Sequence, residues 1–454
     1  MSTPGVLDAL RTQVARSRAL RFPELPDRVR ATAYHSLLDW LGCAVAGSAE
    51  ETTALARAAL DPVAGTSAVI GSPARVGWRD AIVLNGVHGH ALDFDDMLPE
   101  FQGHPSAAIF PALLVLGQER GSTVEEALAA YVAGVEIGVW VARQVMPEHY
   151  DAGWHGTGTM GVFAAAAGAA KLLDLDEDQW IAALDFAATQ SAGIRALFGT
   201  PGKPLHAGKS AEAGALAARL AQAGAASHGQ GLVAPRGYLA LYSAGKTAPA
   251  EPLGYEWALE GMLYKAYASC YMTQSVVDGA LELREQVGAE RIDSVVVTVS
   301  PKLRDVCAIE DPRTGNEAKF SIHATTALGL LGWDLSAEAT FSPSTLLDED
   351  YRRLRERVFL EYDPALGGNE PRSRIRLQLA SGRVLSVERD RGVPEADLPA
   401  RGSALARKTT ALAGDRLGPQ ALDALVSAAG DPTTPIARLC ALATTVASTA
   451  TMPQ

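Results

Sequence analysis

The segment NGVHGHALDFDDMLPEFQGHPS, residues 85–106, has an unusual density of acid–base side chains. Within about twenty residues it holds three histidines and three aspartates, namely His88, His90, Asp93, Asp95, Asp96 and His104. These side chains can exchange protons, ligate a metal or cap helices. The spacing matches no zinc signature, and a prenyl-diphosphate site would need DDxxD spacing and a second acidic motif. We therefore predict no metal site, and we expect most of the six to be caps or core hydrogen-bonding groups and only one or two to be chemical.

A second candidate is GWHGTGTMG, residues 153–161, which contains the spacing Gly156-x-Gly158-x-x-Gly161. A dinucleotide fingerprint needs a buried strand before its glycines, and the preceding PEHYDAGW does not resemble one. We therefore predict no dinucleotide cofactor. The glycines indicate instead the start of a helix, whose N–H groups and dipole favour an anion, with His155 directly before it.

Two lysines lie in apolar, glycine-rich surroundings, Lys203 in GTPGKPLHAGKSAEAG and Lys265 in YKAYASCYMTQSVVDG. Lys203 stands between Gly202 and Pro204, so we expect it in a constrained turn, with His206 nearby, where it could bind a carboxylate. Lys265 lies at a change of sequence pattern and could face a cleft between domains.

The elements that must position these groups are mainly helical. Apolar and small residues recur at three- and four-residue spacing up to about residue 260. Thr123–Glu126 and Asp176–Gln179 read as helix-capping boxes. Segments 291–301 and 374–390 alternate and are β-branched, with a turn at 380–382, whereas 317–332 and 348–361 look helical. The fold class is therefore mainly α with an inserted α+β domain: residues 1–263 and 395–454 form the helical domain, and 264–394 the smaller one.

Composition excludes several functions. The formal charge of −12 argues against a nucleic-acid partner or an anionic membrane surface, which need a basic field. The four cysteines are scattered without a CxxC pair, so neither a disulfide framework nor a zinc knuckle is predicted. No signal peptide or membrane-length apolar run is visible, and we expect a cytoplasmic protein.

In chain order, several segments together resemble the MmgE/PrpD superfamily, which includes 2-methylcitrate dehydratase, cis-aconitate decarboxylase and iminodisuccinate epimerase. The segments are NGVHGHALDFDD, GHPSAAIFPALLVLG, GWHGTGTMGVFAAAAGAAKLL, GKPLHAGKSAEAG, YKAYASC, EAKFSIHATTALGLL and the SGRV hairpin. The resemblance implies a large helical domain, an α+β lid domain, a cleft between them, a homodimer, and catalysis on polycarboxylates without metal or cofactor. It also implies the members of the active site: Asp93, His104, His155, Lys203 and Lys265.

The remaining pocket positions implied by the resemblance show departures. Cys270 lies where members carry a cysteine or a catalytic histidine. Met97 replaces a threonine of the decarboxylase-type members, Gln274 a histidine, and Ala324 a tyrosine, with His323 beside it. A glutamine cannot trade protons near pH 7, and methionine and alanine lack hydroxyl groups.

The function that follows is a lyase of the hydro-lyase type. We expect it to abstract a proton beside the carboxylate of a small substrate, with Lys203 and Lys265 binding carboxylate and oxyanion, His155 or His104 carrying the proton, and Asp93 orienting one of them. Dehydration is favoured over decarboxylation by the departures. The alternatives are an isomerase or epimerase, a biosynthetic tailoring enzyme with a less acidic substrate, and a catalytically inactive binding protein.

Overall fold

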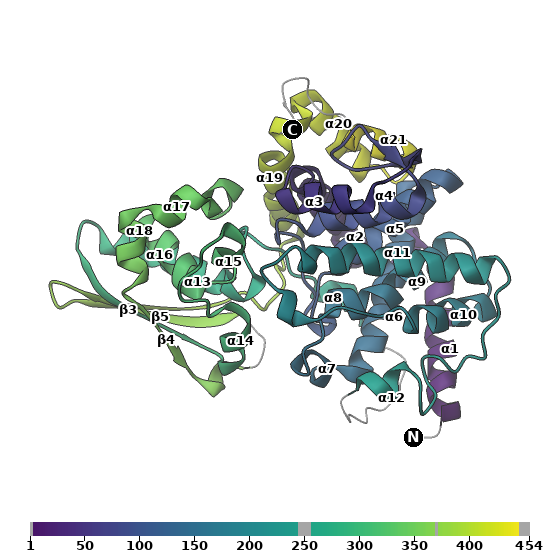
Figure 1. The fold of residues 1–454 in the computed structure, drawn as a ribbon, viewed down its shortest axis with the longest axis horizontal. Helices are drawn as coiled ribbons and strands as arrows, with labels where there is room; N and C mark the ends of the chain where they lie inside the picture. The colour runs from purple at the N-terminus through teal and green to yellow at the C-terminus, as the bar shows by residue number, and fades with distance from the viewer. Residues whose placement is uncertain (1–2, 244–255, 368–370, 445–454) are drawn as a thin grey trace.

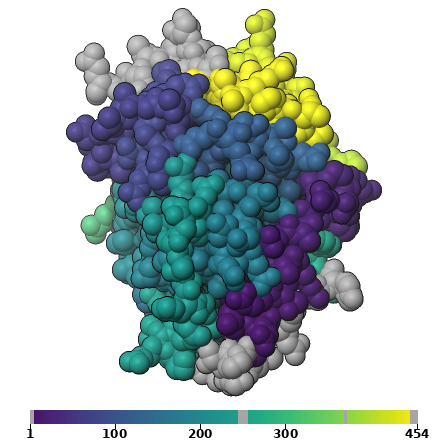
Figure 2. Space-filling model, turned by 90° about the vertical axis from the view of Figure 1, so that its right-hand side faces the viewer, coloured from purple at the N-terminus to yellow at the C-terminus, as the bar shows by residue number. Residues whose placement is uncertain are grey.

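The larger part of the molecule is a helical domain built from both ends of the chain, as a computed structural model describes it over residues 3–243, 256–367 and 371–444 (Figure 1). Figure 2 shows its outer face, where the N-terminal helix and the C-terminal helices both lie against the middle of the chain. Its helices are α1 Thr3–Ala19, α2 Asp27–Gly47, α3 Glu51–Leu60, α4 Trp78–His90, α5 Pro105–Arg120, α6 Val124–Val145, α7 Glu148–Asp151, α8 Gly156–Thr159, α9 Gly161–Leu172, α10 Glu177–Ala188, α11 Gly202–Gln222, α12 Tyr238–Tyr242, α19 Leu398–Leu417, α20 Pro419–Gly430 and α21 Ile436–Ala443.

The starts of two helices are fixed by capping boxes, as the sequence predicts. Thr123 Oγ1 accepts a hydrogen bond from the Glu126 N–H, and the Glu126 carboxylate accepts one from the Thr123 N–H at 2.8 Å. The same exchange between Asp176 and Gln179 opens α10. Each box satisfies two backbone donors that a helix start otherwise leaves unpaired.

The centre of the helical domain is α9, which packs against α6, α11, α5 and α10. All of its residues except Lys171 are buried, and most are alanine or glycine. Small side chains let neighbouring helices approach closely, so the Ala/Gly-rich sequence of α9 suits a helix that is surrounded on every side.

The smaller domain is a four-stranded sheet with helices on one face (Figure 1). The strand order is β4-β3-β5-β6; β3 pairs with β4 in parallel and with β5 antiparallel, and β5 and β6 form a hairpin. Alternate residues of β3 and β5, such as Val297 and Leu377, are buried in the core of this domain, and α13 covers β5 and β6. The elements are β3 Ile292–Val299, β4 Val358–Tyr362, β5 Arg372–Leu379, β6 Val384–Asp390, α13 Gln274–Val287, α14 Arg304–Cys307, α15 Gly315–Lys319, α16 Ile322–Leu331, α17 Pro343–Leu347 and α18 Glu349–Arg355.

The fold class predicted from the sequence is confirmed, and three local predictions are corrected. The predicted helix over 348–361 is wrong beyond Arg355, because 358–362 pairs with β3 as strand β4. The predicted helix over 317–332 is two helices, since Ser321 accepts the Ala324 N–H and starts α16 anew. The N-terminal part also contains a two-stranded sheet, β1 Ala64–Ala68 and β2 Arg75–Val76. The domain boundaries at 264 and 394 stay a prediction.

Short 3-10 helices connect many of these elements. They span Phe22–Glu24, Pro99–Phe101, Arg195–Leu197, Ala258–Gly261, Tyr271–Thr273, Pro301–Leu303, Glu338–Phe341 and Pro364–Leu366. Over the described ranges, none of the helices is both long enough and apolar enough to pass through a bilayer. All four cysteines are buried free thiols.

Candidate active site

Six of the residues singled out in the sequence line one cavity of about 280 Å³. These are Asp93, Met97, His104, His155, Lys203 and Cys270. The first five belong to the helical domain, whereas Cys270 and other lining residues, such as Met272 and Phe320, belong to the part of the chain that leads into and forms the α+β domain. The cavity therefore needs both parts of the chain to be folded.

Asp93 occupies a loop that follows the end of α4. Its φ of 51° lies in the left-handed region, which side chains other than glycine adopt rarely and aspartate more readily than most. A residue held in such a conformation usually has surroundings that determine it, and such residues cluster at functional sites.

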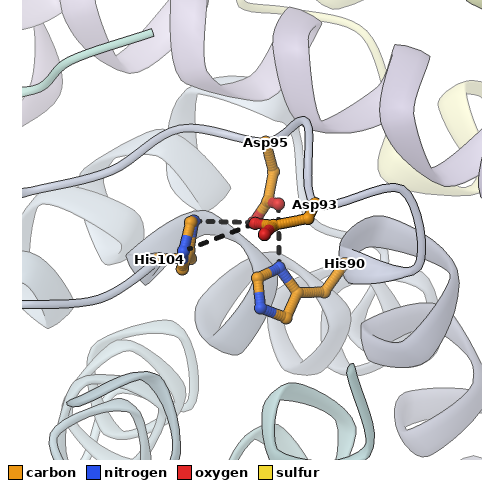
Figure 3. A group of neighbouring side chains, drawn as sticks. All are labelled: His90, Asp93, Asp95 and His104. Carbon is orange, nitrogen blue, oxygen red and sulfur yellow. Dashed lines mark hydrogen bonds and ion pairs between the residues drawn. The ribbon is translucent and has the colours of Figure 1, made fainter. Parts of the chain in front are cut away.

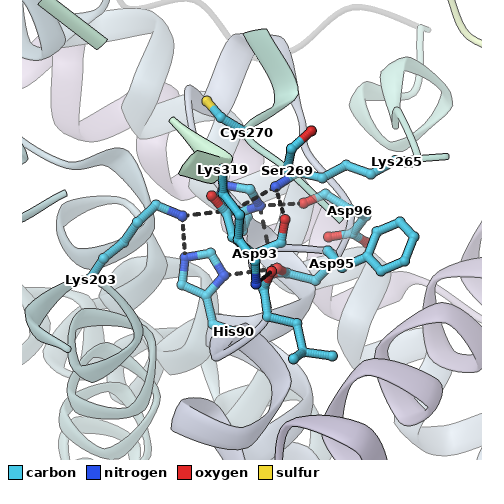
Figure 4. A network of polar contacts seen from close by, with 12 residues as sticks. His90, Asp93, Asp95, Asp96, Lys203, Lys265, Ser269, Cys270 and Lys319 are labelled. Atoms are coloured by element: carbon cyan, nitrogen blue, oxygen red, sulfur yellow. Dashed lines mark hydrogen bonds and ion pairs between the residues drawn. The ribbon is translucent and has the colours of Figure 1, made fainter. Parts of the chain in front are cut away.

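Two ammonium groups converge on the Asp93 carboxylate, as Figure 4 shows. Lys203 Nζ donates to Oδ1 at 2.9 Å, and Lys265 Nζ donates to the same oxygen and to the Asp93 carbonyl. Burial alone would raise the pKa of Asp93, but the two lysines outweigh it and hold that pKa well below its usual range. Asp93 is therefore a carboxylate throughout the neutral pH range.

The loop around Asp93 is fixed by three lysines that bond three consecutive backbone carbonyls. Lys319 Nζ donates to the Leu92 carbonyl at 2.9 Å, Lys265 to that of Asp93, and Lys408 to that of Phe94. The lysines come from α15, from the segment before α13 and from α19. Hydrogen bonds from charged donors are stronger than neutral ones, so the conformation of this loop is held from three separate elements.

A buried chain of hydrogen bonds links Lys203 to Asp95 through His90. His90 Nδ1 lies 2.8 Å from Asp95 Oδ1, and His90 Nε2 lies 2.9 Å from Lys203 Nζ. Because an ammonium group can only donate, His90 Nε2 is the acceptor and Nδ1 carries the proton given to Asp95. Burial lowers the pKa of His90, which keeps this ring neutral. Lys203 thus uses two of its three N–H groups within the protein.

His104 is the N-cap residue of α5 and has one defined tautomer. Its Nδ1 lies 2.6 Å from the Asp96 carbonyl, which can only accept, so Nδ1 carries the proton and Nε2 has the free electron pair. Nε2 lies 3.8 Å from Asp93 Oδ1 (Figure 3). Burial and then Lys203 lower the pKa of His104 well below its ordinary value. The ring is therefore a neutral base on the wall of the cavity.

His155 is placed by close backbone packing around α8. A Cβ on Gly156 would lie 2.4 Å from the Phe101 carbonyl oxygen, and one on Gly158 would lie 2.3 Å from that of Ala192. Packing therefore explains these glycines, and α8 is only four residues long. His155 Nδ1 lies 3.0 Å from Nδ1 of His206, so one ring donates to the other. Burial lowers the pKa of both, that of His206 to about 4.

Comparison with known proteins places the chain in a family. Residues 16–251 match the MmgE/PrpD N-terminal domain, and residues 267–429 match the MmgE/PrpD C-terminal domain. The chain belongs to the MmgE/PrpD family. Members of this family are generally enzymes of the dehydratase and decarboxylase kind. A cis-aconitate decarboxylase-like protein, oryM of Aspergillus oryzae, is 32% identical over 187 residues, a match that covers 39% of each chain.

The cluster His90, Asp93, Asp95 and His104 has a donor set that could hold a metal ion, with all four ligand atoms within 4.8 Å of one another (Figure 3). Its surroundings fit a cation poorly, because Lys203 and Lys265 already bond the Asp93 oxygen. A divalent ion at this cluster would have to approach these two positive charges. The residues present fit a proton-transfer site better than a metal centre.

Five residues predicted for the site lie outside this MmgE/PrpD cavity. Lys265 has a side chain with no exposed surface and stands behind Asp93, and His206 reaches the cavity only through His155. Gln274 braces the loop that carries Lys265, because its amide bonds the backbone of Ala266, Tyr267 and Ser269. His323 donates from Nδ1 to the Val358 carbonyl, and Ala324 is buried in α16.

Lys203 lines the cavity, but it lies in the first turn of helix α11, so the predicted constrained turn is wrong.

The other two members of the acidic segment are core groups. His88 bonds the Ile70 carbonyl at 2.8 Å. The Asp96 carboxyl accepts hydrogen bonds from Ser106, and burial raises the pKa of Asp96 well above its usual value. The sequence predicts such core hydrogen-bonding roles for most of the six residues.

Sequence reasoning missed Tyr150, Phe198, Phe320 and Lys302, which also line the cavity. The centroids of the two phenylalanine rings lie 5.6 and 5.7 Å from the Lys203 ammonium group and 5.9 Å from each other, so both rings flank it from the same side. Lys302 pairs with Asp151 at 2.8 Å, where both side chains are exposed. Tyr150 precedes the GWH motif by a few residues, a proximity that could have drawn notice, but nothing local distinguishes the others.

Proposed function

We propose that the chain is a lyase that removes a proton next to a substrate carboxylate and eliminates water. The observation that carries this proposal is the tautomer of His104, which leaves Nε2 unprotonated on a residue that lines the same cavity as Lys203. A neutral imidazole beside a fixed cation can take a proton from carbon while the cation stabilises the negative charge that develops.

In the proposed reaction the third N–H of Lys203 binds the substrate carboxylate. His104 Nε2 takes the proton from the neighbouring carbon, and the C–H electron pair forms an enolate-like intermediate next to Lys203. The intermediate then expels the β-hydroxyl group, and the C–O electrons leave with it. His155 gives this group a proton, so water departs and a carbon–carbon double bond remains.

His155 can serve as that acid when His206 donates to its Nδ1, because the neutral His155 ring then carries its proton on Nε2. No residue among those described makes a hydrogen bond to His155 Nε2. Asp93 positions Lys203 through Oδ1, whereas its Oδ2 is buried and has no hydrogen-bond partner among the described residues.

A second candidate is an isomerase or epimerase, favoured by the presence of two neutral histidines, His104 and His155, in one cavity. One imidazole would remove the proton and the other would return it from the opposite face, with no leaving group. The third, a tailoring enzyme for a less acidic substrate, uses the same first step. A binding protein without activity would catalyse neither elimination nor proton exchange.

Exchange in deuterated water distinguishes these candidates. A panel of β-hydroxy mono-, di- and tricarboxylic acids is incubated with the chain, and both deuterium uptake and the conjugated double bond are followed. We expect His104→Ala to abolish exchange and elimination, and His155→Ala to retain exchange but lose elimination. His228→Ala, an exposed histidine outside the cavity, is the control and should be unaffected.

Exchange without elimination in the parent protein would favour the epimerase, and binding without either would favour the inactive homologue. Full activity of both the His104 and the His155 variants would overturn the assignment. We further propose a homodimer in the cytoplasm that needs no metal or organic cofactor; light scattering of the purified chain tests the dimer.

A further inference from the structure

We infer that the substrate of this site is an acid with a single carboxylate in the cavity and an apolar body, rather than a di- or tricarboxylate. The inference rests on the proposed function, because it concerns the ligand of the same cavity. It comes from the charges and the side chains that line it.

The cavity has too few unpaired cations for a polycarboxylate. Among the described residues that line it, only Lys203 and Lys302 are basic beyond the histidines, and no arginine is present. The charge of Lys203 is shared with Asp93, and that of Lys302 is paired with Asp151. One further carboxylate can use the free N–H of Lys203, whereas a second or third would be desolvated without a matching charge.

The histidines do not change this balance. Burial and then Lys203 hold the pKa values of His104 and His155 well below their ordinary value, so both rings are neutral near pH 7. Burial also raises the pKa of Cys270 to about 11, which keeps its thiol neutral. The site therefore offers one position for a negative charge, at Lys203.

Apart from Gln102, Tyr150 and Tyr271, most of the remaining wall is apolar, and it comes from both parts of the chain. Met97 and Leu263 pair through their backbones, and both pack in one hydrophobic cluster with Met272, Val306 and Phe320. These five side chains are buried, so a polar or charged group placed against them would lose its hydration without gaining a partner. Met97 stands where the family resemblance places a threonine hydroxyl in decarboxylase-type members.

The volume limits the part of the apolar body that the cavity can enclose. At about 280 Å³ the cavity lies just below the range of ordinary small-molecule pockets, so it suits a compact acid. We therefore expect a carboxylate at Lys203 and a short aliphatic or unsaturated chain against Met97, Leu263 and Met272.

Binding can be measured apart from turnover by using His104→Ala, which the proposed function makes inactive but which removes no charge. Dissociation constants are determined by calorimetry at constant ionic strength for three series: straight-chain monocarboxylates from propanoate to hexanoate, the dicarboxylates of equal length, and citrate with tricarballylate. We expect the affinity of the monocarboxylates to rise about fourfold for each methylene until the cavity is full. The tricarboxylates should bind at least tenfold more weakly than hexanoate.

Two variants test the two ends of the ligand. Lys203→Met should weaken the binding of the acids and leave the binding of their primary amides unchanged. Met97→Thr should reduce the gain per methylene, whereas Met146→Thr, an equally buried methionine outside the cavity, should not.

Tighter binding of citrate than of hexanoate, equal binding of acid and amide, or no binding in any series would overturn the inference. Failure of the proposed function has another signature, namely monocarboxylates that bind as expected while the parent protein exchanges no deuterium into them.

Discussion

The lysine beside His104 should control the pH range in which the proposed base works. Lys203→Met removes one positive charge from the cavity and leaves a side chain of similar length. His104 acts as a base only when it is neutral, and burial together with Lys203 holds its pKa well below the ordinary value. Without that charge, protonated His104 becomes less unfavourable, so its pKa should rise.

The size of the effect follows from two distances. Lys203 Nζ and His104 Nε2 lie 2.9 and 3.8 Å from the same oxygen of Asp93, so they are no more than about 7 Å apart. Two unit charges at that distance repel each other by about 2 kcal/mol at an effective dielectric constant of 20. A change of this size corresponds to a roughly tenfold or greater increase in the proton affinity of His104.

The assay is the pH dependence of kcat/KM on its acid side. In the parent protein activity should fall only when the pH drops well below 6.5, and in Lys203→Met the residual activity should fall at a higher pH, closer to neutrality. Asp93→Asn should move the acid limb the other way, because the Asp93 charge raises the pKa of His104. Lys209→Met, an exposed lysine on the same helix, is the control.

An acid limb that stays in place in Lys203→Met, or moves in the same direction in both variants, would refute the assignment of His104 as the base. A lower rate alone would not support it, since Lys203 also binds the substrate in the proposed reaction.

Two further predictions concern stability and metals. Burial raises the pKa of Glu136 from 4.5 to about 8, so its contribution to stability is complete below pH 4.5 and is lost as the pH rises through 8. Glu136→Gln should therefore be more stable than the parent above pH 8, by about 5 kcal/mol, and similar at pH 4.5, as judged from urea unfolding; equal pH dependence of parent and variant would contradict this. Dialysis against a chelator should leave turnover unchanged, because Lys203 and Lys265 bond the Asp93 oxygen that a metal would need; restoration of activity by added Mn²⁺ or Zn²⁺ would show otherwise.

Local sequence signals predicted those parts of the fold that depend on local interactions. The helix starts at Thr123 and Asp176 are capped by side chains within four residues in the sequence. The sequence alone was therefore sufficient to predict where these helices begin. Strand β4 was missed because Val358–Tyr362 directly follows a helix of charged residues, and only pairing with β3, about sixty residues away, makes it a strand. Non-local pairing of this kind overrides local preference.

The residues of the candidate site likewise divide into those that the local sequence could predict and those that it could not. Asp93, His104, His155 and Lys203 stood out because titratable groups among glycines and apolar residues are uncommon, and the resemblance selected the same ones. Sequence could not separate Lys203, which lines the cavity, from Lys265, which lies behind Asp93, because their local surroundings are alike.

The lysines that hold the Asp93 loop explain why the catalytic geometry depends on the whole chain. Lys319 belongs to the α+β domain and Lys408 to helix α19, and each bonds a carbonyl adjacent to Asp93. Lys408 also pairs with Asp39 at 2.7 Å, and Lys319 with Glu338 at 2.6 Å, so each charge is balanced within its own surroundings. Groups from both domains and from the C-terminal helix therefore hold the loop in which Asp93 adopts its left-handed conformation. Because Asp93 in turn positions Lys203, the geometry of the carboxylate site depends on the same contacts as the cavity.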